Sequence, residues 1–131
     1  MNAGEMAGRY EIPLSLERRH KLREPFVSQN ASLFLTNHIN QEQHCLLALS
    51  PAYWREFLKE LQMLRGQEGL LLQAFYGGGG YELALDNGEI VIPSPLLKWA
   101  GLKECVTLME VENGVNRFEL WDPKALPWSR I

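Results

Sequence analysis

Positively charged side chains gather near the N-terminus, at Arg9, Arg18, Arg19, Lys21 and Arg23. Guanidinium and ammonium groups bind phosphate through charge-assisted hydrogen bonds, so such a cluster favours an anionic partner such as a nucleic-acid backbone. Glu17 and Glu24 interrupt the run, and mixed charges of this kind also suit the solvated face of a helix. Both interpretations stay open at this point.

Other side chains invite a search for catalytic or metal chemistry. His38, His44 and Cys45 are all potential metal ligands, but His44 and Cys45 are adjacent and would point to opposite faces of a strand. No further side chain completes a set of four ligands. His20 has no nucleophile or orienting group at a recognisable spacing. The sequence therefore predicts no metal, no cofactor, no small-molecule substrate and no enzymatic activity.

Four consecutive glycines at 77–80 raise the possibility of a phosphate-binding loop. A P-loop continues into Gly-Lys-Ser/Thr and a helix, whereas this stretch is followed by a predicted strand. The interpretation favoured is a flexible connector.

Composition limits the remaining possibilities. The chain has 131 residues, 46% hydrophobic and 22% charged, which suits one globular domain or two very small ones. Its net charge of −3 provides no general basic field, so any nucleic-acid site must be local. Without a recognisable secretory signal or an apolar run of about 18 residues, the expected setting is the cytoplasm, with no membrane partner and with Cys45 and Cys105 reduced.

The sequence also carries signs of an internal duplication. GRYEIP at 8–13 resembles GEIVIP at 88–93, which places Arg9 opposite Glu89. Each segment predicts a strand that ends at a proline, followed by a helix-prone stretch that Ser15 or Ser94 would cap. Each half then predicts a β-hairpin, over 32–51 and over 105–123, and a helix that begins at Ser50-Pro51 or Asp122-Pro123.

Two helices are expected between these halves. Trp54, Phe57, Leu58, Leu61 and Leu64 share one face at helical spacing, Gly66 interrupts the pattern, and an apolar helix follows over 70–75. The second helix is apolar enough to pack between units or subunits. The predicted organisation is a first unit over 1–52, a helical connector over 53–80 and a second unit over 81–131. The tryptophans, Trp128 among them, are expected in the core or an interface rather than stacked on bases.

Several of these segments resemble the MraZ family of bacterial transcription regulators, which contain two SpoVT/AbrB-like units. The resemblance rests on Gly8-Arg9-x-x-Ile12-Pro13, on Ile90–Pro93, on Trp99–Leu102 and above all on Asn116–Asp122, which reads NRFELWD. It implies an α+β fold of two swapped-hairpin β-barrel units. It also implies a homo-oligomeric ring that binds repeated double-stranded DNA sites upstream of division and cell-wall genes, in the cytoplasm and nucleoid.

The family motif is Asp-x-x-x-Arg in each unit, usually Asp-x-Lys-Gly-Arg in the first, with the arginine facing DNA. Placed on Arg9, the motif has Glu5 in its acidic position and Ala7 in its lysine position, and Glu89 replaces the arginine of the second unit. The implied DNA contacts are Gly8, Arg9, Arg18, Arg19, Lys21 and Arg23. Arg9 paired with Glu5 is the alternative.

Two functions therefore remain. One is a DNA-binding regulator that works through the first unit. The other is an oligomeric protein-interaction or structural module that has kept the fold and lost DNA, which Glu89 and the net negative charge favour.

Overall fold

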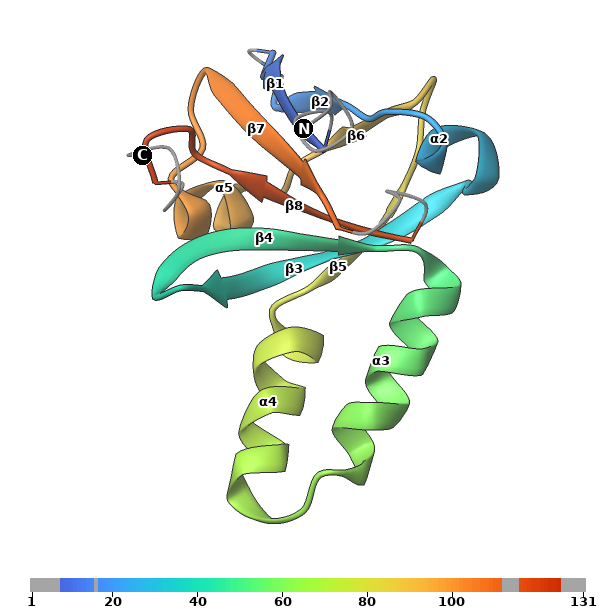
Figure 1. Ribbon diagram of the computed structural model, residues 1–131, viewed down its shortest axis with the longest axis vertical. Helices are drawn as coiled ribbons and strands as arrows, with labels where there is room; N and C mark the ends of the chain where they lie inside the picture. The colour runs from blue at the N-terminus through green and yellow to red at the C-terminus, as the bar shows by residue number, and fades with distance from the viewer. Residues whose placement is uncertain (1–7, 16, 112–115, 126–131) are drawn as a thin grey trace, which may run out of the picture.

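Residues 8–15, 17–111 and 116–125 are described by a computed structural model, and within them the chain has the mixed α+β character that the sequence predicts (Figure 1). The strands are β1 (Arg9–Pro13), β2 (Arg19–Lys21), β3 (Ser32–Asn40), β4 (Gln43–Leu49), β5 (Tyr81–Ala84), β6 (Glu89–Val91), β7 (Cys105–Glu110) and β8 (Arg117–Trp121). The helices are α2 (Phe26–Gln29), α3 (Pro51–Met63), α4 (Gly66–Gly78) and α5 (Ser94–Ala100).

Strands from both halves of the chain share one antiparallel sheet. Its order is β1-β7-β8-β4-β3-β5, and β2 pairs with β6 in a separate two-stranded ribbon. The order is unchanged when β1 is exchanged with β5, β7 with β3, and β8 with β4. First-half strands pair directly with second-half strands at β1–β7, β3–β5, β4–β8 and β2–β6. Each half therefore completes the hydrogen bonding of the other.

One apolar core lies beneath these strands and joins the two halves. Leu35 and Leu46 from the first half and Ile92, Val106 and Leu120 from the second are fully buried in the same cluster. Burial of each such side chain contributes about 2 kcal/mol relative to exposure, so neither half would keep this stabilisation alone.

The segment after Pro13 departs from the prediction. Instead of a short helix, it forms a turn in which the Ser15 amide donates to the Arg19 carbonyl, and then strand β2. Arg19–Lys21 are a strand because they hydrogen-bond to β6. The Ser15 side chain closes this turn by accepting a hydrogen bond from the Arg19 amide at 3.1 Å, and caps no helix. The matching prediction for the second half is confirmed, since α5 begins at Ser94, although the Ser94 side chain makes no capping bond.

The remaining local predictions fare differently. The β3–β4 hairpin and the helix start at Ser50-Pro51 are confirmed, and the Ser50 hydroxyl accepts a hydrogen bond from the Tyr53 amide at 3.2 Å. Asn113-Gly114 lies outside the described residues, as does Trp128. Residues 122–125 form a turn, and the rest of the helix that Asp122-Pro123 predicts lies outside the described residues.

Helices α3 and α4 form a hairpin that projects away from the sheet (Figure 1). Leu61 is buried as its spacing predicts, but Leu64 is 47% exposed. The glycine run ends α4, and its last two residues pack closely rather than acting as a loose connector: a Cβ on Gly80 would lie 2.2 Å from the Phe34 ring. Phe34 in turn stacks on Trp54, with ring centroids 3.8 Å apart. Within the described part of the chain, no helix is long and apolar enough to cross a membrane.

Candidate nucleic-acid interface

The ribbon of β2 and β6 carries two of the predicted contact residues. His20 faces Ile90 across the ribbon, with Arg19 opposite Val91 and Lys21 opposite Glu89. Opposed residues and next-but-one residues share a face of a ribbon. His20 and Ile90 are buried, so Arg19 and Lys21 lie on the other, outer face together with Glu89.

Hydrogen bonds show which residues of the two halves are equivalent. The Leu22 amide donates to the Gly88 carbonyl at 2.8 Å, and the Ile92 amide donates to the Arg18 carbonyl at 2.9 Å. Arg18 and Gly88 both have positive φ, at 64° and 77°. This exchange pairs Arg18–Leu22 with Gly88–Ile92, so the alignment of Gly8–Pro13 with Gly88–Pro93 is wrong. The counterpart of Glu89 is Arg19, not Arg9.

Arg19 is held by two acidic side chains of the second half. Its Nε donates to Glu89 Oε1 at 2.8 Å, and its Nη2 donates to Asp86 Oδ2 at 3.2 Å. These hydrogen bonds, to Glu89 first and to Asp86 second, raise the pKa of the guanidinium. Sequence reasoning missed this cluster, because Arg19 lies 70 residues from Glu89 and 67 residues from Asp86 along the chain.

The other predicted contacts lie on or beside β1. Arg9 is half-buried opposite Met109, and Glu5, its alternative partner, lies outside the described residues. The Gly8 carbonyl accepts a hydrogen bond from the Glu110 amide at 2.6 Å. The guanidinium carbon of Arg23 lies 3.5 Å from the centre of the Tyr10 ring, and this contact joins the loop after β2 to β1.

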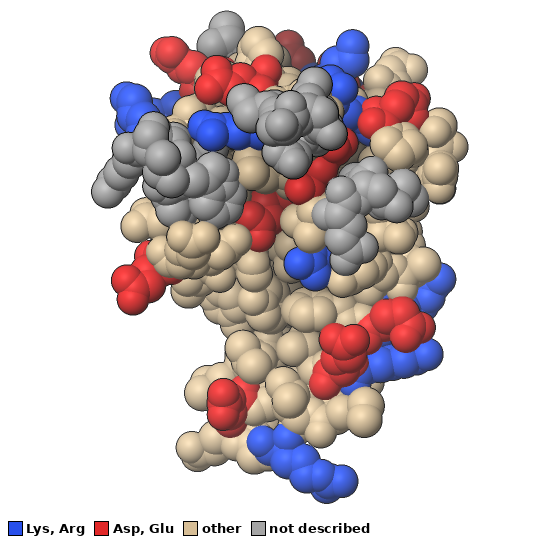
Figure 2. Space-filling view, in the orientation of Figure 1, with Lys and Arg blue, Asp and Glu red and all other residues tan. Residues whose placement is uncertain are grey.

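We call these cations the N-terminal basic surface: Arg9, Arg18, Arg19, Lys21 and Arg23. β1 and β2 lie side by side at the end of the molecule opposite the helical hairpin (Figure 1). Beside them is an open cleft of about 550 Å³, whose lining includes Lys21, Arg23 and Gly88. Figure 2 shows that positive and negative side chains intermingle at this end. The elements that carry the predicted cations thus lie at one end of the molecule, and acidic side chains stand among them.

Comparison with known proteins decides the family. The chain matches no family model. It is 31% identical to the transcriptional regulator MraZ of Shewanella violacea over 127 residues, which cover 90% of this chain and 73% of that protein. The MraZ of Coxiella burnetii is also 31% identical, over 122 residues covering 91% of this chain and 74% of the relative. The chain belongs to the MraZ family.

The equivalence of Arg18–Leu22 with Gly88–Ile92 places the arginine of the MraZ motif at Arg19, whereas the sequence placed it at Arg9. On Asp-x-Lys-Gly-Arg, Arg19 takes the arginine position, Ser15 the aspartate position and Arg18 the glycine position. Glycine accepts a positive φ without strain, which accounts for the unusual φ of Arg18. Sequence reasoning missed this register because Gly8-Arg9 and Ile12-Pro13 imitate the same pattern one segment earlier.

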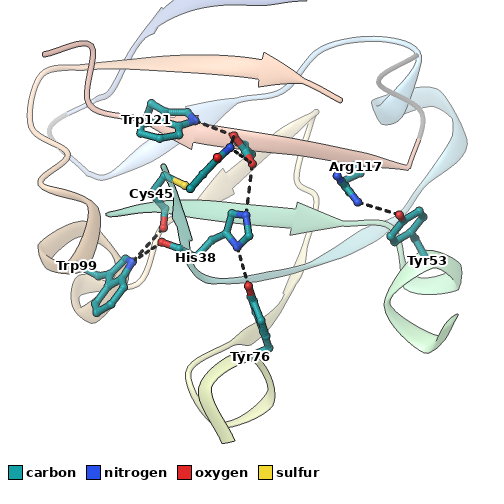
Figure 3. A network of polar contacts seen from close by, with 9 residues as sticks. His38, Cys45, Tyr53, Tyr76, Trp99, Arg117 and Trp121 are labelled. Atoms are coloured by element: carbon teal, nitrogen blue, oxygen red, sulfur yellow. Dashed lines mark hydrogen bonds and ion pairs between the residues drawn. The ribbon is translucent and has the colours of Figure 1, made fainter. Parts of the chain in front are cut away.

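A second polar cluster lies between the sheet and α4 of this MraZ-family chain (Figure 3). Glu119, nearly buried on β8, accepts hydrogen bonds from Trp121 Nε1 at 2.9 Å and from Asn40, and lies 3.4 Å from His38 Nε2. Burial alone would raise the pKa of Glu119, but the hydrogen bonds from His38 and Trp121 outweigh it and lower that pKa. His38 Nδ1 lies 2.9 Å from the Tyr76 hydroxyl, which ties α4 to the sheet.

These contacts give the candidate metal ligands structural roles. The His44 ring stacks on Trp99 with centroids 3.7 Å apart. Cys45 is fully buried, and burial raises the pKa of its thiol far above the ordinary value. The Trp99 indole N–H donates to the carbonyls of His38 and Cys45. Among the described residues no three potential ligands gather closely enough to hold a metal ion.

Proposed function

We propose that this chain is a transcription regulator, and not an enzyme, that binds double-stranded DNA through the N-terminal basic surface. The names of its relatives support the regulatory role. The DNA contact rests on one observation: β1, β2 and the segments beside them, which carry the predicted cations, lie at one end of the molecule. The resemblance to MraZ implies repeated sites upstream of division and cell-wall genes, and hence a cytoplasmic, nucleoid-associated protein.

In this proposal the residues divide the work. Arg19 occupies the motif position and contacts a phosphate or a base edge, while Lys21 and Arg18 beside it hold the backbone. Arg9 and Arg23 extend the contact across β1, where Tyr10 supports the Arg23 guanidinium. Gly8, at the start of β1, lets the DNA backbone approach the chain closely. Glu89 keeps the second half from making an equivalent contact.

Binding to the DNA upstream of the chain's own gene tests this proposal. Arg9→Ala and Arg19→Ala are compared at two salt concentrations, with Arg65→Ala between α3 and α4 as the matched control. Each lost phosphate contact should weaken binding and flatten the dependence of log K on log salt by about 0.9. Equal losses for Arg65→Ala, or no preference over scrambled DNA, would refute the proposed surface.

We also propose that the chain assembles into a ring through the end of the helical hairpin. Met63, Leu64, Leu70 and Leu71 are 79%, 47%, 67% and 69% exposed there. Adjacent exposed apolar side chains of this kind mark interaction surfaces. Replacing both Leu70 and Leu71 with serine should reduce the mass measured by light scattering, whereas Gln67→Ser on the same helix should not. An unchanged mass would refute this interface.

A protein-interaction module that has lost DNA is the second candidate. It is favoured by the acidic side chains that interrupt the N-terminal basic surface. Glu89 and Asp86 both form ion pairs with Arg19, and Glu11 is exposed on β1. In this case the folded, oligomeric protein should show no salt-dependent DNA binding at low salt. Under either candidate we propose that the units over 1–52 and 81–131 exchange strands and so form one structure. The pairing of β1 with β7 and of β4 with β8 supports this exchange.

A further inference from the structure

Arg19 is the cation whose donors are most completely engaged. Nε and Nη2 form one edge of the guanidinium, and both donate to carboxylates of the second half. A phosphate is bound by the same kind of paired donors. An anion that uses this edge must therefore displace Glu89, Asp86 or both.

The position of Glu89 strengthens this competition. Glu89 lies directly opposite Lys21 and bonds diagonally to Arg19, so it sits between the two cations on the outer face of the ribbon. Its negative charge reduces the attraction of both for an anion. Asp86 adds a second negative charge at the turn that leads into β6.

The clamp is open to exchange. The Asp86 side chain is 72% exposed and that of Glu89 is 36% exposed, so solvent and ligands reach both carboxylates. Exposed ion pairs are readily exchanged and salt-sensitive. The ribbon does not depend on them, because the backbone bonds between Leu22 and Gly88 and between Ile92 and Arg18 hold it together.

We propose that Glu89 and Asp86 form an autoinhibitory clamp on Arg19, which must open before the N-terminal basic surface binds a phosphate backbone at full strength. This inference rests on the proposed function and adds its regulation. Conditions or partners that draw the two carboxylates away would raise the affinity of the surface without changing the fold.

The test compares removal of the clamp with removal of the same charge elsewhere. The clamp variant is Glu89→Gln with Asp86→Asn. The control is Glu42→Gln with Glu60→Gln, two exposed acids on the β3–β4 turn and on α3 that form no ion pair with any described residue. Both are also made with Arg19→Ala. Elution from heparin and binding to the upstream DNA are measured for each protein.

The clamp variant should elute from heparin at higher salt than the control, and the difference should vanish in the Arg19→Ala background. On DNA that binds the parent chain, its salt dependence should be steeper than that of the parent and of the control, and the Arg19→Ala background should remove the difference. Equal shifts for clamp and control variants, or a gain that persists without Arg19, would overturn the clamp.

The two proposals fail in different ways. A heparin gain that depends on Arg19, without preference for the upstream DNA over scrambled DNA, would keep the clamp and refute the proposed function. Specific DNA binding by the parent chain, without an Arg19-dependent heparin gain in the clamp variant, would keep the proposed function and refute the clamp. If the double variant loses its native circular dichroism, Glu89→Gln alone, which keeps the Asp86 contact, replaces it and should show a smaller gain.

Discussion

Replacing His20 with leucine should stabilise the protein, and more so as the pH falls. The His20 side chain is completely buried, with an exposed fraction of 0%. Neither of its ring nitrogens has a hydrogen-bond partner among the described residues. It faces Ile90 in the β2–β6 ribbon. An unpaired buried polar group costs about 1–3 kcal/mol, so His20→Leu should gain an amount of this order at neutral pH.

The pH dependence follows from the same burial, which lowers the pKa of His20 from 6.5 to about 4. Between these values the unfolded chain binds a proton that the folded chain does not, so acidification favours unfolding. A difference of roughly 2.5 pH units corresponds to about 3 kcal/mol, lost progressively as the pH falls from about 6.5 to about 4. His20→Leu lacks this loss, so its advantage should widen by about 3 kcal/mol over the whole range and by about 2 kcal/mol between pH 7.5 and pH 5.

Urea unfolding followed by tryptophan fluorescence measures both effects. The free energy of unfolding of His20→Leu and of the parent chain is compared at about pH 7.5 and about pH 5, and contributions common to both cancel in the difference. His44→Gln, which removes one exposed histidine, is the matched control for the loss of a histidine. An advantage of His20→Leu that is the same at both pH values would refute the buried, neutral imidazole.

Three further predictions concern strain, packing and charge. Arg18→Gly should raise the free energy of unfolding by about 1 kcal/mol in the same assay, because Arg18 has a φ of 64°. Gly80→Ala should lower it by about 1–3 kcal/mol, since the new Cβ would meet the Phe34 ring, whereas Gly77→Ala has open space and should not. Glu119→Gln should be destabilising at neutral pH by about 1–3 kcal/mol. Its deficit should shrink below about pH 4, because the folded pKa of Glu119 lies below the ordinary value and the carboxylate's contribution is lost as the pH falls through it.

Local signals were enough to predict several elements. The alternation of 32–49 with a polar turn predicted the β3–β4 hairpin, and Ser50-Pro51 predicted the start of α3, because these depend on neighbouring residues. The strand β2 was missed for the opposite reason. Arg19–Lys21 contains no apolar alternation of its own, and it is a strand only because β6 pairs with it.

The candidate site shows the same division. The sequence indicated which side chains carry the positive charge, and the resemblance indicated the family. It placed the motif arginine at Arg9, since Gly8–Pro13 repeats the letters of the second half. Only the hydrogen bonds of Arg18 and Leu22 to the second half identified Arg19 as the equivalent residue.

The sequence by itself determined the α+β class, the two central helices, the cluster of cations and the family. The tertiary structure decided which strands pair between the halves, which arginine faces Glu89, and that this arginine is already bonded to two carboxylates. The physical reason is distance along the chain. Arg19 and Glu89 are 70 residues apart, and no local propensity reports a contact that exists only when both halves fold into one sheet and ribbon.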